Sequence, residues 1–388
     1  MYVIRNGTVY TMKDDKAISA DILVSDKGKI EKIAKNITVK DAKVIDATGK
    51  VVLPGFVDAH SHIGGVFMEG VDLDDLNECT DPLTPQLDSY YGITPDDKQF
   101  KIAQRCGITT SCLIPGSANV IGGWGIVLKS DEGTIDERLL KHPVCLKAAT
   151  GINPKGVYSK MSRMPMTRMG IAFLMRDYFR KVKEYKDKKD KAKNDPKKMP
   201  PYDLGLEHGI PVLEKKIPLK VHTYMHDMVT VVQIAKEFDI NVTIDHAQGA
   251  SDYYDVLKDE HVKGVIFGPI SAGLFPGEGG KIDFECCKGL DDRGITVTVM
   301  TDGPVTPENL LLTEVGEAVR KGMDPIRALR MITANAARIL MVDDRVGSLE
   351  KGKDADILIF DALPSLDVRA NLLMTMINGK VVYQKDEV

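Results

Sequence analysis

Residues 55–65 read GFVDAHSHIGG and place two histidines, His60 and His62, on either side of one serine. The whole chain has eight histidines in 388 residues. Chance alone gives about 0.16 expected pairs with this spacing, so the His-x-His motif is weak evidence for a site when taken alone. The meaning of the pair therefore depends on the fold around it.

The length, composition and charge of the chain limit the classes of protein to which it can belong. The chain has room for a barrel of about 250 residues and a smaller unit. It is 43% hydrophobic and 28% charged, with a net charge of −4, which does not suggest binding to nucleic acid. Neither a signal peptide nor an apolar run long enough to span a membrane is evident. We therefore expect a cytoplasmic homo-oligomer that acts on a small molecule, without a nucleic-acid or membrane partner.

The six cysteines show no Cys-x-x-Cys pair. Such spacing is what a zinc ribbon or a redox motif would need. We expect reduced, packed thiols.

The two ends of the chain share a β-rich composition. Residues 1–53 contain short extended runs separated by turn signals such as Asn6-Gly7, and residues 347–388 return to the same pattern, with Asn378-Gly379 as a hairpin turn. Neither end looks able to close a core alone. The sequence therefore predicts one small β-sandwich domain built from both termini.

The middle of the chain, residues 54–346, predicts an α/β fold. Apolar strand-like runs alternate there with helical segments, including a long helix that begins near Met169 and ends in a lysine-rich, solvated stretch. The eight runs are residues 55–60, 109–114, 124–129, 143–149, 218–224, 241–247, 264–270 and 295–302. Buried runs of this kind favour a parallel (β/α)8 TIM-like barrel.

Polar side chains at the ends of these runs point to a metal site. Active sites of such barrels lie at the carboxyl ends of the strands. Strand alternation puts His60 and His62 on one side of the first strand, while His222, His246 and Asp302 end three other runs. A single histidine at a strand end is more often a packed core or cap residue. The combined set favours a divalent metal such as zinc.

These residues resemble the amidohydrolase superfamily of metal-dependent hydrolases. The resemblance rests on LPGFVDAHSH, KVHTYMHD, TIDHAQG, VMTDGP and ITANAARILMVDDRVGSLEKGKDADILIFD, and so spans nearly the whole chain. The segment PGSANVIGG is similar to an imidazolonepropionase-related subgroup of predicted amidohydrolases.

The resemblance implies a ligand set. His60, His62 and Asp302 would hold a more buried ion, and His222 and His246 a second one, bridged by a carboxylated Lys147. Alternation places Lys147 inward with Cys145, and burial favours the neutral amine that captures carbon dioxide. The alternative is that Lys147 pairs with a carboxylate or reaches solvent. The subgroup's Glu-Asn-Pro-Lys reads Ile152-Asn153-Pro154-Lys155 here, which leaves one metal or two open.

The family likeness also implies the chemistry. A metal-activated water would hydrolyse an amide-type C–N bond of an N-acyl amino acid, dipeptide or cyclic amide, with Asp302 as the catalytic base. Deamination is the alternative within the superfamily, but Met225 stands where deaminases commonly carry a glutamate. A non-catalytic scaffold is a further alternative, although such relatives typically lose ligands that this chain keeps.

Several other residues are candidates for substrate binding. Asp58 shares a strand face with His60 and is expected to support it. Arginine forks match carboxylates, so Arg163 and Arg168 are candidates for a substrate carboxylate, with an ordinary surface role as the alternative. His226 is expected at the pocket rim or as a helix cap. The remaining candidates for the pocket wall are Asn119, Trp124 and Tyr158.

Overall fold

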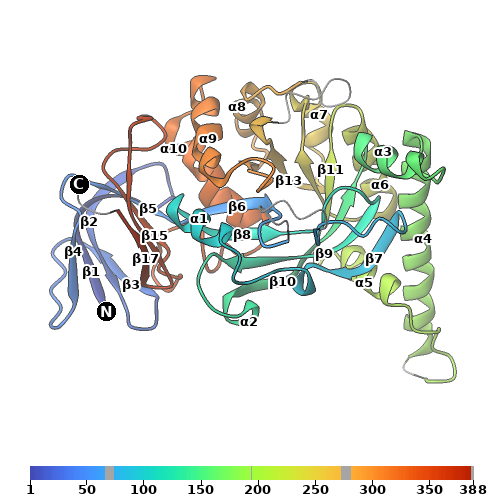
Figure 1. The fold of residues 1–388 in the computed structure, drawn as a ribbon, viewed down its shortest axis with the longest axis horizontal. Coiled ribbons are helices and arrows are strands. Elements are labelled where there is room, and N and C mark those ends of the chain that lie inside the picture. Colours follow the sequence, from blue (N-terminus) through green and yellow to red (C-terminus); the bar gives the residue numbers. More distant parts are fainter. Residues whose placement is uncertain (66–73, 194, 272–280, 386–388) are drawn as a thin grey trace.

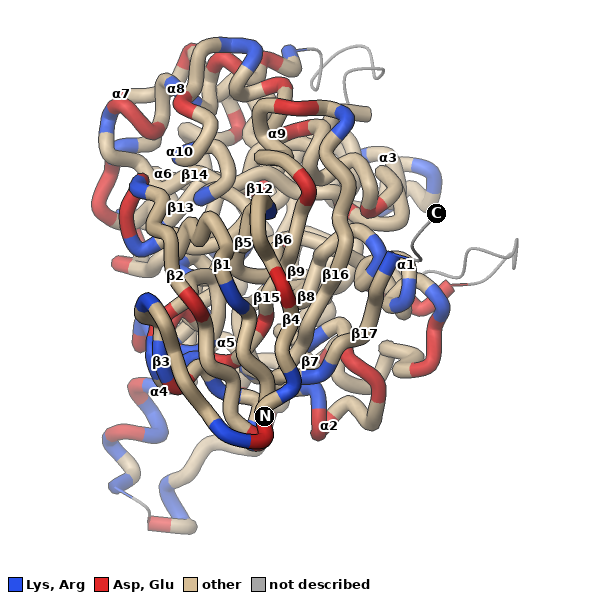
Figure 2. The backbone as a smooth tube through the Cα atoms, turned by 90° about the vertical axis from the view of Figure 1, so that its left-hand side faces the viewer, with Lys and Arg blue, Asp and Glu red and all other residues tan. Residues whose placement is uncertain are grey.

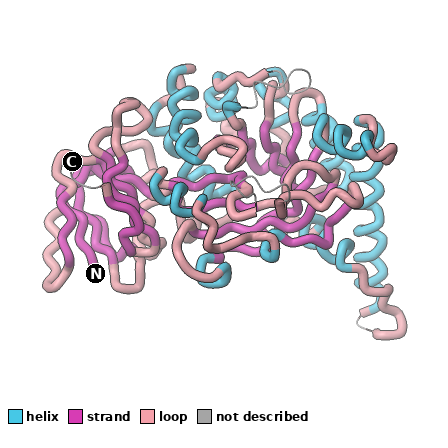
Figure 3. The backbone as a smooth tube through the Cα atoms, viewed as in Figure 1, coloured by secondary structure: helices cyan, strands magenta, loops and turns pink. Residues whose placement is uncertain are grey.

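The computed structural model describes residues 1–65, 74–193, 195–271 and 281–385. These residues form two β-sheets, with helices packed against the second (Figures 1 and 3). The ranges predicted for the two domains also contain residues 66–73, 194, 272–280 and 386–388, which lie outside the described residues.

The first sheet joins strands from both ends of the chain (Figure 1). Its order is β17-β16-β15-β5-β1-β2-β3, and β4 pairs with β1. The strands are β1 (Tyr2–Tyr10), β2 (Ala17–Val24), β3 (Ile30–Ala34), β4 (Lys43–Asp46), β5 (Val51–Pro54), β15 (Ile357–Phe360), β16 (Leu372–Ile377) and β17 (Lys380–Gln384). The antiparallel pairing of β15 with β5 joins the two ends, and places Leu358 opposite Leu53. Hydrogen bonds connect all eight strands into one sheet; the sandwich arrangement and the domain boundaries stay predictions.

The second sheet forms a nearly closed barrel in the order β14-β13-β12-β11-β10-β9-β8-β6, with β7 paired to β9. The backbone nitrogen of His62 donates to the carbonyl of Gly303 (2.7 Å), which brings the first and last strands together. The strands are β6 (Phe56–Ser61), β7 (Leu83–Asp88), β8 (Ile108–Leu113), β9 (Ile121–Lys129), β10 (Leu139–Ala149), β11 (Leu219–Thr223), β12 (Val242–His246), β13 (Val262–Phe267) and β14 (Val297–Val299). Each of the eight predicted runs therefore overlaps one barrel strand.

One strand departs from the predicted parallel barrel. β9 runs antiparallel to both β8 and β10, so the parallel prediction is wrong at this strand. The connection from β8 to β9, residues 114–120, contains no helix. Parallel neighbours need a crossover of a dozen or more residues, and this loop is too short to provide one.

Helices pack around the barrel sheet, most of them above the strands and at the right in the view of Figure 3. They are α1 (Gln99–Arg105), α2 (Ile135–Arg138), α3 (Ile152–Lys160), α4 (Arg168–Ala192), α5 (Leu204–Leu213), α6 (Asp227–Phe238), α7 (Tyr254–Leu257), α8 (Glu285–Asp291), α9 (Leu311–Arg320), α10 (Pro325–Arg330) and α11 (Ala336–Ile339), with short 3-10 or π turns at Ser89–Tyr91, Ala250–Asp252, Glu308–Leu310 and Met331–Asn335. No helix among these described residues has the length and apolar character needed to cross a membrane.

Helix α4 is the predicted long helix. Thr167 caps its first turn by accepting a hydrogen bond from the backbone nitrogen of Gly170 (3.1 Å). Its first half buries Ile171, Met175 and Phe179, and the helix packs against α5 and α6. Its last turns carry alternating basic and acidic side chains and extend away from the body of the molecule (Figure 2), so the lysine-rich end is a solvated helix end.

A buried ion cluster joins the barrel to the terminal sheet. Lys129, at the end of β9, is 1% exposed. Its ammonium pairs with Asp356 and lies 3.0 Å from Asp354. Asp354 in turn pairs with Arg345 (2.8 Å) and with Lys29 of the terminal sheet. Because buried charges need partners, this cluster makes the packing of each sheet depend on the other.

We expect Lys129→Met to destabilise the protein by about 3 kcal/mol, because it leaves buried carboxylates without their shared cation. Urea denaturation measures the change. The matched control is Lys101→Met, since Lys101 pairs at the surface with Glu132 (3.7 Å); we expect it to cost less than about 0.5 kcal/mol. Equal unfolding midpoints for the two variants would contradict the structural role of the cluster.

Candidate functional site

The histidine pair lies at the carboxyl end of β6, where every residue is buried. His60 is fully buried and His62 is 4% exposed. Their rings are perpendicular, with centroids 5.2 Å apart. Both side chains face the barrel interior, as strand alternation predicts.

Asp302 follows β14, the last strand of the barrel, and lies beside the histidine pair of β6. Its Oδ1 atom lies 3.0 Å from His62 Nε2 and 3.1 Å from His60 Nε2. The ligand atoms of these three residues all lie within 4.8 Å of one another. Asp302 has a φ of 56°, a left-handed backbone conformation that is uncommon outside glycine. Strain of this kind gathers at functional sites.

The remaining two predicted histidines join the group. His222 lies on β11 and His246 ends β12, with ring centroids 3.8 Å apart. The ring of His246 is 5.0 Å from that of His60, and its φ of 67° is again left-handed. The structure thus brings together the five side chains that the sequence places at strand ends.

The free ring nitrogens of this group fit a metal ion. His222 Nε2 is buried and has no hydrogen-bond partner among the described residues, whereas His60 Nε2 faces the carboxylate of Asp302, itself a candidate ligand, at 3.1 Å. The other nitrogen of each ring is held, because His60 Nδ1 lies 2.6 Å from Asp245 Oδ2 and His222 Nδ1 lies 2.8 Å from Ser117 Oγ. Imidazoles fixed in this way present a lone pair to a cation such as zinc.

The protonation states of the group agree with this fit. Burial lowers the pKa of His246 to about 3 and holds the pKa of His222 well below its ordinary value. Burial alone would raise the pKa of Asp302, but the adjacent His60 and His62 rings outweigh this effect and keep the pKa well below its usual range. Neutral imidazoles and an ionised carboxylate are the forms that bind metals.

Sequence reasoning missed Asp245 and Ser117. Asp245 is fully buried and lies 2.7 Å from Lys220 Nζ as well as beside His60; Thr243 Oγ1 also donates to it (2.9 Å). The sequence does contain a sign of Asp245, because it stands next to a candidate ligand histidine in TIDHAQG. Metal-binding histidines commonly use a nearby carboxylate to hold the ring nitrogen that does not bind the metal. No spacing rule points to Ser117.

Asp58, which the sequence predicts as support for His60, is buried below the pair. Its Oδ1 atom accepts from the backbone nitrogen of His60 (3.3 Å), and its Oδ2 atom accepts from Thr301 Oγ1. Burial raises the pKa of Asp58 to about 7. Asp58 thus contacts the backbone of His60, whereas Asp245 orients the His60 ring.

Lys147 is fully buried on β10. Its ammonium lies 3.3 Å from Ser117 Oγ, the hydroxyl that holds His222. Burial lowers the pKa of Lys147 to about 8, although Asp245 and Asp302 act in the opposite direction. Within the described part of the chain it has neither an ion-pair partner nor access to solvent. The alternative roles for Lys147, an ion pair with a carboxylate or contact with solvent, do not fit this placement.

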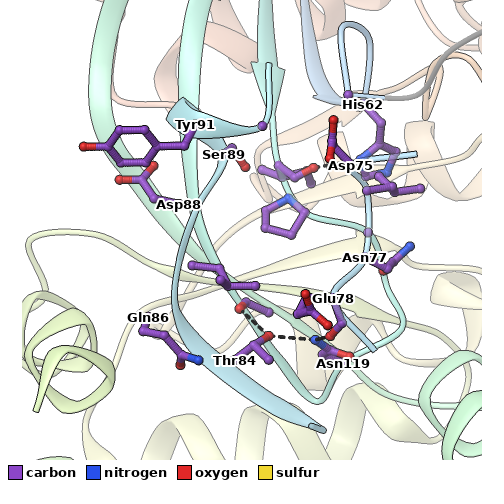
Figure 4. A pocket seen from close by; sticks show the side chains of 18 of the residues that line it. His62, Asp75, Asn77, Glu78, Thr84, Gln86, Asp88, Ser89, Tyr91 and Asn119 are labelled. Carbon is purple, nitrogen blue, oxygen red and sulfur yellow. Dashed lines mark hydrogen bonds between the residues drawn. The ribbon is translucent and has the colours of Figure 1, made fainter. Parts of the chain in front are cut away.

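Two cavities open onto the group. We name the first the mouth cavity, of about 420 Å³; its wall includes His62, Asn77, Asn153, Lys160, His222 and Asp302. We name the second the side cavity, of about 470 Å³; its wall includes His62, Asp75, Asn77, Glu78, Asp88 and Tyr91 (Figure 4). The two cavities meet at His62 and Asn77. Ile152 also lines the mouth cavity and offers no ligand atom there.

Two of the predicted pocket residues form one buried network. Tyr158 Oη lies 2.5 Å from Asn119 Oδ1, and Asn119 Nδ2 donates to Thr84 Oγ1 (2.7 Å) and to the carbonyl of Glu78 (2.8 Å), as Figure 4 shows for Asn119. Asn119 lines the side cavity, whereas Tyr158 lines neither cavity. Tyr158 therefore orders the cavity wall without facing its interior.

The predicted arginines and His226 lie outside both cavities. Arg163 pairs with Asp81 (2.9 Å) and Arg168 with Asp227 (3.0 Å). His226 is exposed before α6 and makes no side-chain cap. Trp124 stacks on His208 at 3.5 Å and donates from Nε1 to the carbonyl of His208 (3.1 Å).

We expect Asp245→Asn to weaken zinc affinity by about 10–100-fold, because His60 loses the carboxylate that orients its ring. Competition with a chromophoric chelator measures the affinity. Asp259→Asn is the matched control, since Asp259 Oδ1 contacts His261 Nδ1 (2.8 Å) away from the site. Wild-type zinc affinity in a folded Asp245→Asn protein would show that Asp245 does not support the site.

Known proteins share this fold and these motifs. Residues 202–382 match an amidohydrolase family model, and residues 43–87 match a second one. The structure is similar to that of an amidohydrolase from Thermotoga maritima MSB8, with a TM-score of 0.94 and 38% identity over 99% of this chain and 100% of that chain. Amidohydrolase tasK of Hapsidospora irregularis is 28% identical over 92% of this chain and 39% of its own length.

A shorter match is found with a dihydroorotase of Bacillus thuringiensis (strain Al Hakam), which is 43% identical over 74 residues, 18% of this chain and 17% of the relative. The chain thus spans well under half the length of either curated relative. The match to the Thermotoga protein covers both chains almost completely. The chain therefore belongs to the amidohydrolase superfamily.

Proposed function

We propose that this protein is a metal-dependent hydrolase of an amide-type C–N bond, in an N-acyl amino acid, a dipeptide or a cyclic amide. One observation carries the proposal: four buried histidines and an ionised aspartate converge at the carboxyl ends of barrel strands beside an open cavity, and His222 Nε2 has no partner among the described residues. A divalent ion at this place would supply Lewis acidity, which polarises a carbonyl and acidifies water.

The placement of the side chains supports the following ligand roles. His60, His62 and Asp302 would hold one ion, most simply zinc, and His222 and His246 would hold a second. A carboxylated Lys147 would bridge the two, since its ammonium lies beside the hydroxyl that holds His222. The apolar Ile152 cannot add a ligand, so the number of ions rests on Lys147.

Asp302 is the proposed base. Its carboxylate lines the mouth cavity and is ionised, so it can accept a proton from the attacking water. The same carboxylate then protonates the departing nitrogen, which leaves as an amine. Asp245 and Ser117 keep His60 and His222 in fixed orientations while this proton moves.

Two alternatives receive less support. Deaminases of this superfamily commonly carry a glutamate where this chain has Met225. The methionine side chain cannot donate or accept a proton in the reaction. A non-catalytic scaffold does not need the ligand set that this chain keeps. Cytoplasmic location and a homo-oligomeric state stay predictions.

We expect the purified protein to contain a divalent metal and to hydrolyse C–N bonds only when loaded. The experiment is a screen of N-acyl amino acids, dipeptides, lactams and hydantoin-like rings with metal-loaded and chelator-treated protein, together with metal analysis. His60→Ala and His62→Ala should each lose most of the metal and the activity, because three-residue ligand sets depend on each member. Full metal occupancy in the double variant would overturn the site assignment.

We expect Lys147→Ala to lose one of two ions and the turnover, because a carbamate is an anionic two-oxygen ligand that alanine cannot replace. Bicarbonate during loading should raise the metal content of the wild type toward two ions per chain, and a short carboxylic acid should partly restore the variant. Metal analysis and turnover are the measurements. Unchanged metal content and turnover in Lys147→Ala would mean a mononuclear site.

A further inference from the structure

The mouth cavity has one cation in its described wall. Apart from the histidines, the ionisable side chains that line it are Asp302 and Lys160. Lys160 ends helix α3 and is exposed. Its ammonium therefore lies at the entrance to the candidate ligand group.

Lys160 also differs from the arginines that follow it. The guanidinium groups of Arg163 and Arg168 lie close to Asp81 and Asp227, so their charges are already compensated. Among the described residues no carboxylate pairs with Lys160. An exposed, uncompensated lysine at the wall of a cavity can bind an incoming anion without breaking an existing ion pair.

The side cavity has the opposite charge. The described acidic residues of its wall are Asp75, Glu78 and Asp88, and neither lysine nor arginine is among its described lining residues (Figure 4). Because the two cavities meet at His62, a bound molecule would experience a negative wall on one side and Lys160 on the other. An anionic group would be repelled from the side cavity and attracted to the mouth cavity.

We propose that Lys160 binds the carboxylate of the substrate and so selects N-acyl amino acids or dipeptides over neutral cyclic amides. This inference rests on the proposed C–N hydrolysis. In both selected classes the carboxylate is one carbon away from the scissile nitrogen. A carboxylate at Lys160 therefore holds the scissile bond toward His62, His222 and Asp302, which line the same cavity.

The test compares acids with their neutral amides. The probes are N-acetyl-L-alanine, N-acetyl-L-leucine and N-acetyl-L-phenylalanine, each beside its C-terminal carboxamide. With the loaded protein we expect Lys160→Gln to raise KM for the acids about tenfold, with little change in kcat and none for the carboxamides. Lys160→Glu should favour the carboxamides. Lys183→Gln makes the same charge change on the exposed face of α4 and should behave as wild type.

Calorimetric binding of the same probes separates this inference from the proposed function. The wild type should bind the acids more tightly than the carboxamides, with a difference that shrinks at high salt and is absent in Lys160→Gln. Equal binding of acids and carboxamides by the wild type, or an unchanged preference in Lys160→Gln, would overturn the role of Lys160. Absence of turnover with selective binding intact would instead contradict the proposed hydrolysis.

Discussion

The closure of the barrel by two adjacent backbone hydrogen bonds is the constraint on which the site depends. The nitrogen of Asp302 donates to the carbonyl of His60 (3.1 Å), and so joins the start of the barrel to its end. These two residues are far apart in sequence, yet the bond sets their side chains against each other. Because His62 and Gly303 make the adjacent bond, the closure positions three candidate ligands at once.

Closing the barrel around polar groups costs folding free energy, which the surrounding structure must offset. His246 and Asp302 have left-handed backbone conformations, each costing on the order of 1–3 kcal/mol. Below them, Asp245 and Lys220 form a buried ion pair that also holds His60. Buried polar groups of this kind are stable only when their hydrogen bonds are satisfied. His222 Nε2, which has no hydrogen-bond partner among the described residues, is therefore a place where the site can accept a ligand.

The sequence predicts side-chain directions that depend on the local residue pattern, and it misses roles that depend on contacts with residues distant in sequence. Alternation and strand ends were enough to place His60, His62 and Lys147 inside the barrel, because side-chain direction follows from strand period. The reversed direction of β9 was missed because apolar runs carry no direction. Asp245 was missed because its role depends on a residue far away in sequence. Arg168 was assigned to the substrate because its partner, Asp227, becomes visible only in the fold.

Anomalous diffraction can show whether the five side chains converge on a metal ion. Crystals of the zinc-loaded protein, measured on both sides of the zinc absorption edge, would locate the ion without reference to activity. We expect an anomalous peak between His60 Nε2, His62 Nε2 and the carboxylate of Asp302. A fully loaded crystal with no peak at that place, or with peaks only at the cysteines or the surface, would contradict this expectation.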